Sequence, residues 1–165
     1  MRAPVQFVVI AGGFGTRLRP LTLDRPKALV PLLNRPQILH VLDRLPPDCD
    51  RVIVAVNYMY ERVRDFFEAL DSEVEVVVVN EPHPLGTGGA IKNIEDHVTG
   101  TFAVANGDVV DSIDFEPFAK FHRRCRGIGS LGVWPVEDPT AFGVVALDGD
   151  RITRFVEKPQ ETEAP

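Results

Sequence analysis

Short apolar runs rich in β-branched residues recur along the first two thirds of the chain. They are Gln6–Ala11, Val52–Val56, Val74–Val79 and Phe102–Ala105. Apolar runs of this length, bounded by turn-forming residues, are typical of buried β-strands. The pattern therefore predicts four core strands.

Between these runs the apolar residues are spaced so that they share one face of a helix. The three predicted faces are Ile38, Leu42 and Leu45; Val63, Phe66, Phe67 and Leu70; and Phe115, Phe118, Ala119 and His122. Asp114 is placed to cap the last of these helices. Alternating strands and helices predict an α/β fold with a doubly wound, mostly parallel sheet, whose ligands bind beyond the carboxyl ends of the strands.

After Gly127 the pattern changes, and strand follows strand. Ile128–Val136, Phe142–Leu147 and Arg151–Val156 read as strands, and Asp148–Asp150 reads as a hairpin turn. We therefore expect an antiparallel β extension of the parallel core.

The composition fits one domain over residues 1–165, because 44% of the 165 residues are hydrophobic. A net charge of −6 argues against a nucleic-acid or anionic-membrane surface. We find no signal-peptide pattern and no apolar run near the ~20 residues that cross a bilayer, so we expect a cytoplasmic protein. Cys49 and Cys125 lack the spacing of a zinc or redox site.

A glycine-rich, basic loop, GGFGTRLRPLTLDRPK, follows the first apolar run from Gly12 to Lys27. It fails the dinucleotide-binding pattern, which requires a third glycine where Leu18 stands, and it fails the Walker pattern at Thr16 and Arg17. Both patterns lead into a helix, whereas this loop and its continuation contain Pro20, Pro26, Pro31 and Pro36. Because proline opposes helix formation, we expect the loop to run extended.

The loop carries four basic residues in an acidic chain, namely Arg17, Arg19, Arg25 and Lys27. Together with outward-pointing backbone amides they predict a site for several negative charges, such as a triphosphate. The alternative is a solvated surface loop whose basic residues pair with nearby acids. The position after a buried first strand favours the binding site.

The segment NEPHPLGTGGAIKNI leaves the third predicted strand and opens a helix at Thr87, Gly88 and Gly89. Glycines in a first turn weaken a helix, so they indicate a group lying flat against the backbone, either a base or ribose or a tight helix–sheet contact. Glu81 ends the strand. Its carboxylate could accept the paired N1–H and 2-amino donors of guanine, or it could be a surface acid.

The strand FAVAN ends in Asn106, Gly107 and Asp108. A carboxylate at this edge, beside a polyphosphate loop, suits Mg²⁺, which takes one or two protein carboxylates plus phosphate oxygens. We assign the metal to Asp108, with Asp111 as the second choice. Without the neighbouring motifs, Asp108 would be interpreted as a turn former.

The last hairpin, FGVVALDGDRITRFVEKP, has Gly143 at its start and Glu157 and Lys158 at its end. Adjacent side chains on a strand point to opposite faces, so these two could serve one ligand only where the strand stops, and Pro159 marks that stop. One division gives Glu157 the sugar hydroxyls and Lys158 a phosphate. The alternative is ordinary surface charge.

Taken in order, AGGFGTRLRPLTLDRPKALVPL, EPHPLGTGGAI, NGD and the final hairpin resemble the sugar-1-phosphate nucleotidyltransferases. The resemblance covers nearly the whole chain. It implies a Rossmann-like, glycosyltransferase-A-like nucleotidyltransferase fold. It also implies a Mg²⁺-dependent reaction in which a sugar 1-phosphate attacks the α-phosphorus of a nucleoside triphosphate and releases pyrophosphate.

The resemblance also implies roles for individual residues. Arg17 would stabilise the departing pyrophosphate, Lys27 the α-phosphate, Asp108 would bind Mg²⁺ and Lys158 the sugar phosphate. These are the catalytic candidates. The nucleotide-binding set is Ala11, Gly12, Gly13, Gly15, Thr16, Arg17, Lys27, Glu81, Gly86 and Gly88, and the sugar-binding set is Asn106, Gly143, Glu157 and Lys158.

Glu81 stands where relatives that use uracil or thymine resemble one another in carrying Gln, which favours GTP and, with it, mannose 1-phosphate. A heptose 1-phosphate, a UTP- or dTTP-dependent enzyme, and a non-catalytic GDP-sugar-binding regulatory module stay open. The family domain normally continues past the E-K-P motif, so we expect the domain to be incomplete at its C-terminus and to turn over little by itself. The oligomeric state is open, with a homo-oligomer among the alternatives.

Overall fold

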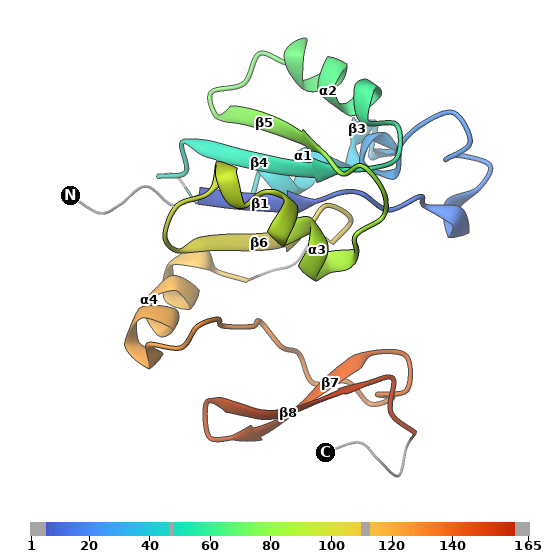
Figure 1. Cartoon of the computed structure of the whole chain (residues 1–165). Coiled ribbons are helices and arrows are strands. Elements are labelled where there is room, and N and C mark those ends of the chain that lie inside the picture. The colour runs from blue at the N-terminus through green and yellow to red at the C-terminus, as the bar shows by residue number, and fades with distance from the viewer. Residues whose placement is uncertain (1–5, 47, 110–112, 161–165) are drawn as a thin grey trace. The chain divides into compact units, whose positions relative to one another are not determined.

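The computed structural model describes residues 6–46, 48–109 and 113–160 (Figure 1). The chain divides into two compact units, Met1–Phe121 and His122–Pro165. Within the described residues, no helix is long and apolar enough to cross a membrane.

The first unit is built on a four-stranded sheet in the order β5-β4-β1-β6, and every neighbouring pair is parallel. The strands are β1 (Gln6–Ile10), β4 (Arg51–Val56), β5 (Glu75–Asn80) and β6 (Phe102–Asn106). Each corresponds to one of the four apolar runs, so the predicted parallel sheet is confirmed. Its order places β1 in the middle, with the chain's next core strand, β4, on one side and β6 on the other.

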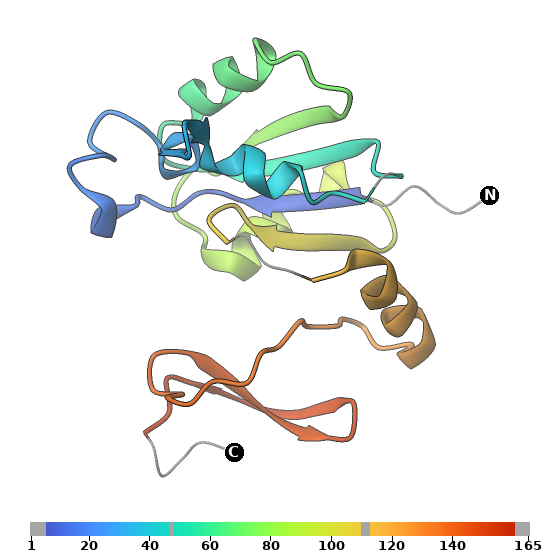
Figure 2. The same ribbon diagram turned by 180° about the vertical axis from the view of Figure 1, so that it is seen from behind.

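Helices cover both faces of this sheet, as predicted. Val8 and Ile53 face α3 (Gly86–Asn93) through its buried Ala90. Val9 and Val54 face the opposite way, toward α1 (Gln37–Leu42) and α2 (Tyr60–Glu68). Figure 1 shows α3 in front of the sheet. Figure 2, the view from the opposite side, shows α1 in front of it. Neighbouring residues of a strand thus supply two separate cores, which explains the uninterrupted apolar runs.

Helix α4 (Phe115–Cys125) begins where the sequence placed its cap. The Oδ1 atom of Asp114 accepts a hydrogen bond from the Glu116 N–H at 3.2 Å, which confirms the predicted capping role. The Phe115 ring packs on Phe7 of β1, with 5.5 Å between ring centroids. The start of α4 is therefore fixed to the central strand.

The glycine-rich loop is not extended throughout, so that expectation was wrong in part. It contains two 3₁₀ turns, η1 (Thr16–Leu18) and η2 (Lys27–Leu29); a third, η3 (Glu95–His97), follows α3. Proline removes its own N–H but its carbonyl can still accept, and the Leu29 N–H bonds to the Pro26 carbonyl at 2.9 Å. The prolines therefore prevent a long helix while allowing single turns.

A two-stranded hairpin that the sequence analysis did not predict follows η2. Its strands are β2 (Pro31–Leu32) and β3 (Arg35–Pro36), which pair antiparallel. Leu33 and Asn34 between them both have positive φ, at 51° and 62°. Two consecutive left-handed residues are typical of the tight turn that joins two antiparallel strands.

The second unit contains the predicted final hairpin as its own two-stranded sheet. Its strands are β7 (Gly143–Asp148) and β8 (Arg151–Glu157), and Gly149 in the turn has a φ of 56°. The strand predicted over Ile128–Val136 is absent. Gly129, Gly132 and Pro135 interrupt that run and weaken strand pairing, which outweighs its β-branched residues.

Candidate functional site

A cavity of about 180 Å³ lies at the carboxyl ends of β1 and β6, between the two strands where the order of the sheet reverses. Such a reversal is where doubly wound folds bind ligands. The lining residues are Ile10, Ala11, Gly12, Gly13, Lys27, Ala28, Asn106, Gly107 and Asp108. Six of the predicted site residues are thus brought together: Ala11, Gly12, Gly13, Lys27, Asn106 and Asp108.

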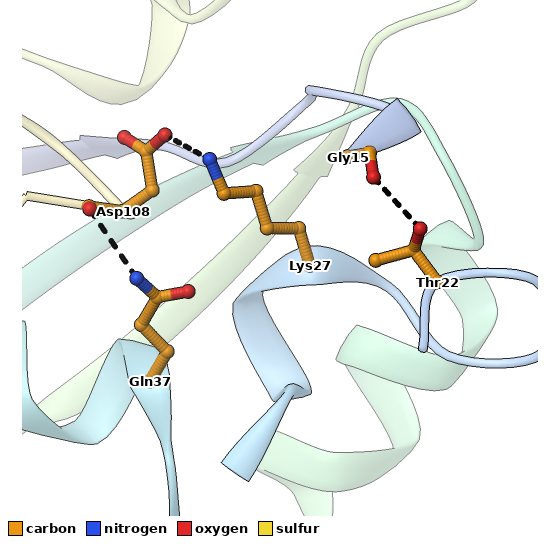
Figure 3. Close-up of polar contacts among 5 residues, drawn as sticks. All are labelled: Gly15, Thr22, Lys27, Gln37 and Asp108. Carbon is orange, nitrogen blue, oxygen red and sulfur yellow. Dashed lines mark hydrogen bonds and ion pairs between the residues drawn. The ribbon is translucent and has the colours of Figure 1, made fainter. Parts of the chain in front are cut away.

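Lys27 and Asp108 form an ion pair across this cavity (Figure 3). Their side chains are 22% and 40% exposed, so both can be reached by a ligand. The Gln37 side chain, at the start of α1, donates a hydrogen bond from Nε2 to the Asp108 carbonyl at 3.3 Å. Sequence reasoning missed Gln37, because no motif links it to a residue 71 positions away.

Gly107 is a second residue whose role was missed, since the sequence analysis named it only as one of the residues at the end of the strand. It is buried, and a Cβ atom there would lie 3.2 Å from the Ala11 Cβ, the Ile10 carbonyl oxygen and the Val9 Cγ1. Its N–H bonds to the Ile10 carbonyl at 2.8 Å. Glycine thus allows the chain after β6 to lie against β1, which places Asp108 at the cavity.

Glu81, just beyond β5, is 4% exposed, so the interpretation as a surface acid was wrong. Its backbone is held on both sides, because its N–H bonds to the Val56 carbonyl at 2.7 Å and its carbonyl accepts from Asn57 Nδ2 at 2.8 Å. Its carboxylate lies against the loop. A Cβ atom added to Gly12 would lie 2.9 Å from Glu81 Oε1.

The Glu81 carboxylate is only partly satisfied. The Leu85 backbone N–H donates to it, but Oε1 is buried and has no hydrogen-bond partner in the described part of the chain. Burial raises the pKa of Glu81 above its ordinary value, and the Leu85 bond opposes this in part. A buried unpaired acceptor is costly. An N–H donor from a ligand would relieve that cost.

The glycines that open α3 fall into two kinds. A Cβ atom on Gly88 would meet nothing within 4 Å, whereas one on Gly89 would lie 2.7 Å from the Cβ of Leu85 in the preceding turn. The tight helix–sheet contact weighed for this pair is therefore wrong at Gly88, where the backbone faces open space. Gly86 has a φ of 68°, which favours glycine. Gly86 and Gly88 stay predicted nucleotide contacts.

Gly15, Thr16 and Arg17 of the loop do not line the cavity. Gly15 has a φ of 62° and precedes η1, in which Thr16 and Arg17 are exposed. Arg17 makes no ion pair with any residue that the structure describes. Its charge is therefore available, as a phosphate-binding role requires.

The three predicted residues of the final hairpin lie together within the second unit. Gly143 pairs with Glu157 across the strands, and a Cβ atom on Gly143 would lie 2.8 Å from Glu157 Oε2. The strand stops at Glu157 as predicted. Lys158 then turns into the left-handed region at a φ of 45°, and its N–H bonds to the Phe142 carbonyl at 2.9 Å.

The carboxylates of the described residues do not form a metal cage, because no group of three or more His, Cys, Asp or Glu side chains is placed to hold an ion. Mg²⁺ does not require one when phosphate oxygens and water complete its shell. Asp108 supplies one exposed carboxylate at the cavity, which fits that pattern. Asp111, the second choice, lies outside the described residues.

The chain is similar in sequence to known nucleotidyltransferases. The family model described as nucleotidyl transferase matches residues 6–165. The chain is 41% identical to the mannose-1-phosphate guanylyltransferase catalytic subunit beta of Drosophila pseudoobscura pseudoobscura, over 93% of this chain and 43% of that protein. It is 38% identical to the mannose-1-phosphate guanyltransferase of Saccharomyces cerevisiae, over 93% and 45%. The chain thus spans less than half the length of these relatives.

Solved structures give the same result for the fold. A putative glucose-1-phosphate thymidylyltransferase from Bacillus anthracis matches with a TM-score of 0.82 at 25% identity, over 95% of this chain and 65% of that one. HddC from Yersinia pseudotuberculosis, complexed with GMP-PN, matches with a TM-score of 0.72 at 28% identity, over 94% and 70%. The predicted fold class is confirmed.

The contact between Gly12 and Glu81 predicts unequal effects of alanine at two neighbouring glycines. Gly12→Ala forces the carboxylate away from the loop and should lower the free energy of unfolding by about 1–3 kcal/mol. Gly13→Ala is the matched control, because a Cβ there meets nothing within 4 Å, and it should change stability by no more than about 0.5 kcal/mol. Urea denaturation measures both. Equal losses would contradict the contact.

The raised pKa of Glu81 predicts a pH-dependent difference from Glu81→Gln. The folded chain holds this proton more tightly than the unfolded chain, whose Glu titrates near 4.5. The stability that Glu81 contributes is present below that pH and is lost as pH rises through the folded-state pKa. Wild type should therefore lose unfolding free energy relative to Glu81→Gln as the pH rises above 4.5. A constant difference would show that Glu81 titrates normally.

Proposed function

We propose that this chain, which belongs to the nucleotidyl transferase family, acts in the transfer of GMP from GTP to mannose 1-phosphate, giving GDP-mannose and pyrophosphate. The names of the relatives support guanine and mannose. The observation that carries the proposal is the buried, unpartnered Oε1 of Glu81 against Gly12.

Guanine matches this carboxylate better than the pyrimidine bases do. Its Watson–Crick edge offers two adjacent donors, N1–H and the 2-amino group, whereas uracil and thymine offer a single N3–H between two carbonyl oxygens. Beside a buried carboxylate those carbonyl oxygens would be left facing an acceptor. In this proposal the base lies at Glu81, and the open space at Gly88 leaves room for a ligand against the backbone.

The triphosphate extends from the base along the glycine loop. The loop starts at β1, so Gly12 contacts the base side of the site while Lys27 closes the phosphate side. Lys27 exchanges Asp108 for the α-phosphate, and Arg17 binds the terminal phosphates. Asp108 is then released to hold Mg²⁺, which when bound neutralises phosphate charge.

The reaction exchanges one phosphorus–oxygen bond for another. A phosphate oxygen of mannose 1-phosphate bonds to the α-phosphorus of GTP, and the bond from that phosphorus to the bridging oxygen of the β-phosphate breaks, so pyrophosphate leaves with the electron pair. The nucleophile is already an anion and needs no general base. Lys27 and Arg17 therefore act by position and charge. Glu157 and Gly143 bind the sugar, and Lys158 its phosphate.

A panel of triphosphates tests the base preference. Wild type should bind GTP more tightly than UTP or dTTP, and Glu81→Gln should weaken GTP binding by about 1.5–3 kcal/mol, the usual worth of a charged hydrogen bond. Glu75→Gln is the control, because Glu75 is an exposed acid at the other end of β5. Calorimetry on the purified chain measures the affinities. A wild-type preference for UTP would overturn the assignment of Glu81.

Pyrophosphate release with GTP and a set of sugar 1-phosphates tests the sugar. The proposal expects mannose 1-phosphate to be preferred when the chain is extended to the full length of its relatives. Preference for a heptose 1-phosphate would show that the substrate is a heptose and not mannose. Binding of GDP-mannose without any release of pyrophosphate would indicate a regulatory module.

The role of Asp108 predicts how Mg²⁺ affects GTP binding. Adding Mg²⁺ should strengthen GTP binding to wild type, and Asp108→Asn should remove most of that gain because the carboxylate ligand is lost. Asp43→Asn serves as the control, since Asp43 is an exposed acid that pairs with Arg35 outside the cavity. Titrations with and without EDTA provide the comparison. An unchanged Mg²⁺ effect in Asp108→Asn would exclude Asp108 as the ligand.

A further inference from the structure

Thr22 lies inside the glycine loop although it does not line the cavity. It is 1% exposed, and its Oγ1 donates a hydrogen bond to the Gly15 carbonyl at 2.8 Å (Figure 3). A Cβ atom added to Gly15 would lie 2.9 Å from Thr22 Cγ2 and 3.1 Å from Lys27 Cβ. Thr22 therefore packs where the first part of the loop meets its end at Lys27.

The segment after β4 holds Thr22 from the other side. The Tyr58 hydroxyl donates to the Thr22 carbonyl at 3.1 Å, and the Tyr58 ring packs on Phe14 with 5.4 Å between centroids. From α2, the Arg62 guanidinium donates to the Asp24 carbonyl. Tyr58 thus contacts the loop both before Gly15 and at Thr22.

These contacts determine the direction of one amide. In a trans peptide the C=O and the following N–H point in opposite directions. The Gly15 carbonyl accepts from both Thr22 Oγ1 and the Leu18 N–H, so the Thr16 N–H must point the other way. Thr16 is the first residue of η1, so its N–H makes no hydrogen bond within the turn.

We propose that Thr22 and Tyr58 are positioning residues for the triphosphate, which fix the Gly15–Arg17 turn at a set place relative to Lys27. This inference rests on the proposed function and adds to it two residues that do not line the cavity. The base is bound elsewhere, at Glu81. Loss of either hydroxyl should therefore weaken binding of the terminal phosphates and leave the base and α-phosphate unaffected.

Affinities of the purified chain for Mg²⁺-bound GTP and for GMP test this division. Thr22→Val keeps the side-chain shape and removes Oγ1, and it should weaken GTP binding about three- to tenfold, as expected for one hydrogen bond, while GMP binding changes less than about twofold. Thr22→Ser restores the hydroxyl and should recover most of the GTP affinity. Tyr58→Phe should likewise weaken the binding of GTP and leave the binding of GMP unchanged.

Two matched variants control for the loss of a hydroxyl elsewhere. Thr153→Val removes a similar bond, from Thr153 Oγ1 to the Ala146 carbonyl at 3.2 Å in the final hairpin. Tyr60→Phe alters a tyrosine of α2 whose ring lies under Arg64. Neither should change the ratio of GTP to GMP affinity.

The outcomes distinguish the proposed triphosphate site from the positioning role of Thr22 and Tyr58. Wild type that binds GTP no better than GMP would contradict the proposed triphosphate site itself. A second outcome would overturn the positioning role alone. In it, wild type binds GTP more tightly than GMP, but Thr22→Val and Tyr58→Phe either weaken binding of both nucleotides equally or weaken neither. If Thr22→Val is unfolded in a thermal scan, the comparison of Tyr58→Phe with Tyr60→Phe decides.

Discussion

The central position of β1 in the sheet is the constraint on which the site depends. Parallel pairing with β4 on one side and β6 on the other brings the segments that follow these three strands to the same edge of the sheet. The loop after β1 then lies between two carboxylates of different character. Glu81 on the β4–β5 side is buried, and Asp108 after β6 is exposed and paired with Lys27. In the proposed function, one loop would thereby serve an uncharged base on one side and the charged phosphates with their metal on the other.

The glycines of this site lie in two kinds of surroundings. Gly12 and Gly107 are sites where another group lies close to the space that a side chain would need, so glycine there allows close packing. Gly13 and Gly88 face open space, where glycine leaves room for a ligand to reach the backbone. The same residue type therefore has two physical roles, and only the three-dimensional neighbours distinguish them.

The sequence predicted the four core strands, because uninterrupted apolar runs occur only where both faces of a strand are buried. It also placed Asp108 at the carboxyl end of a strand, beside the basic loop that carries Lys27, and the structure shows an ion pair between these two side chains. It overpredicted the strand at 128–136, because β-branched residues favour a strand without supplying a partner for it. Gln37 carried no signal, since a lone polar side chain bonded to a distant carbonyl belongs to no motif. Thr22 lies within the quoted loop motif, but the sequence alone assigned it no role.

A crystal structure of the chain with GTP tests the central claim, that Glu81 recognises guanine, most directly. The quantity to measure is the distance from Glu81 Oε1 to the nitrogens of the base. The account predicts that guanine N1 or the 2-amino nitrogen lies within about 3.2 Å of Oε1, at hydrogen-bonding distance. Guanine bound elsewhere, with Oε1 still unpaired beside Gly12, would contradict it.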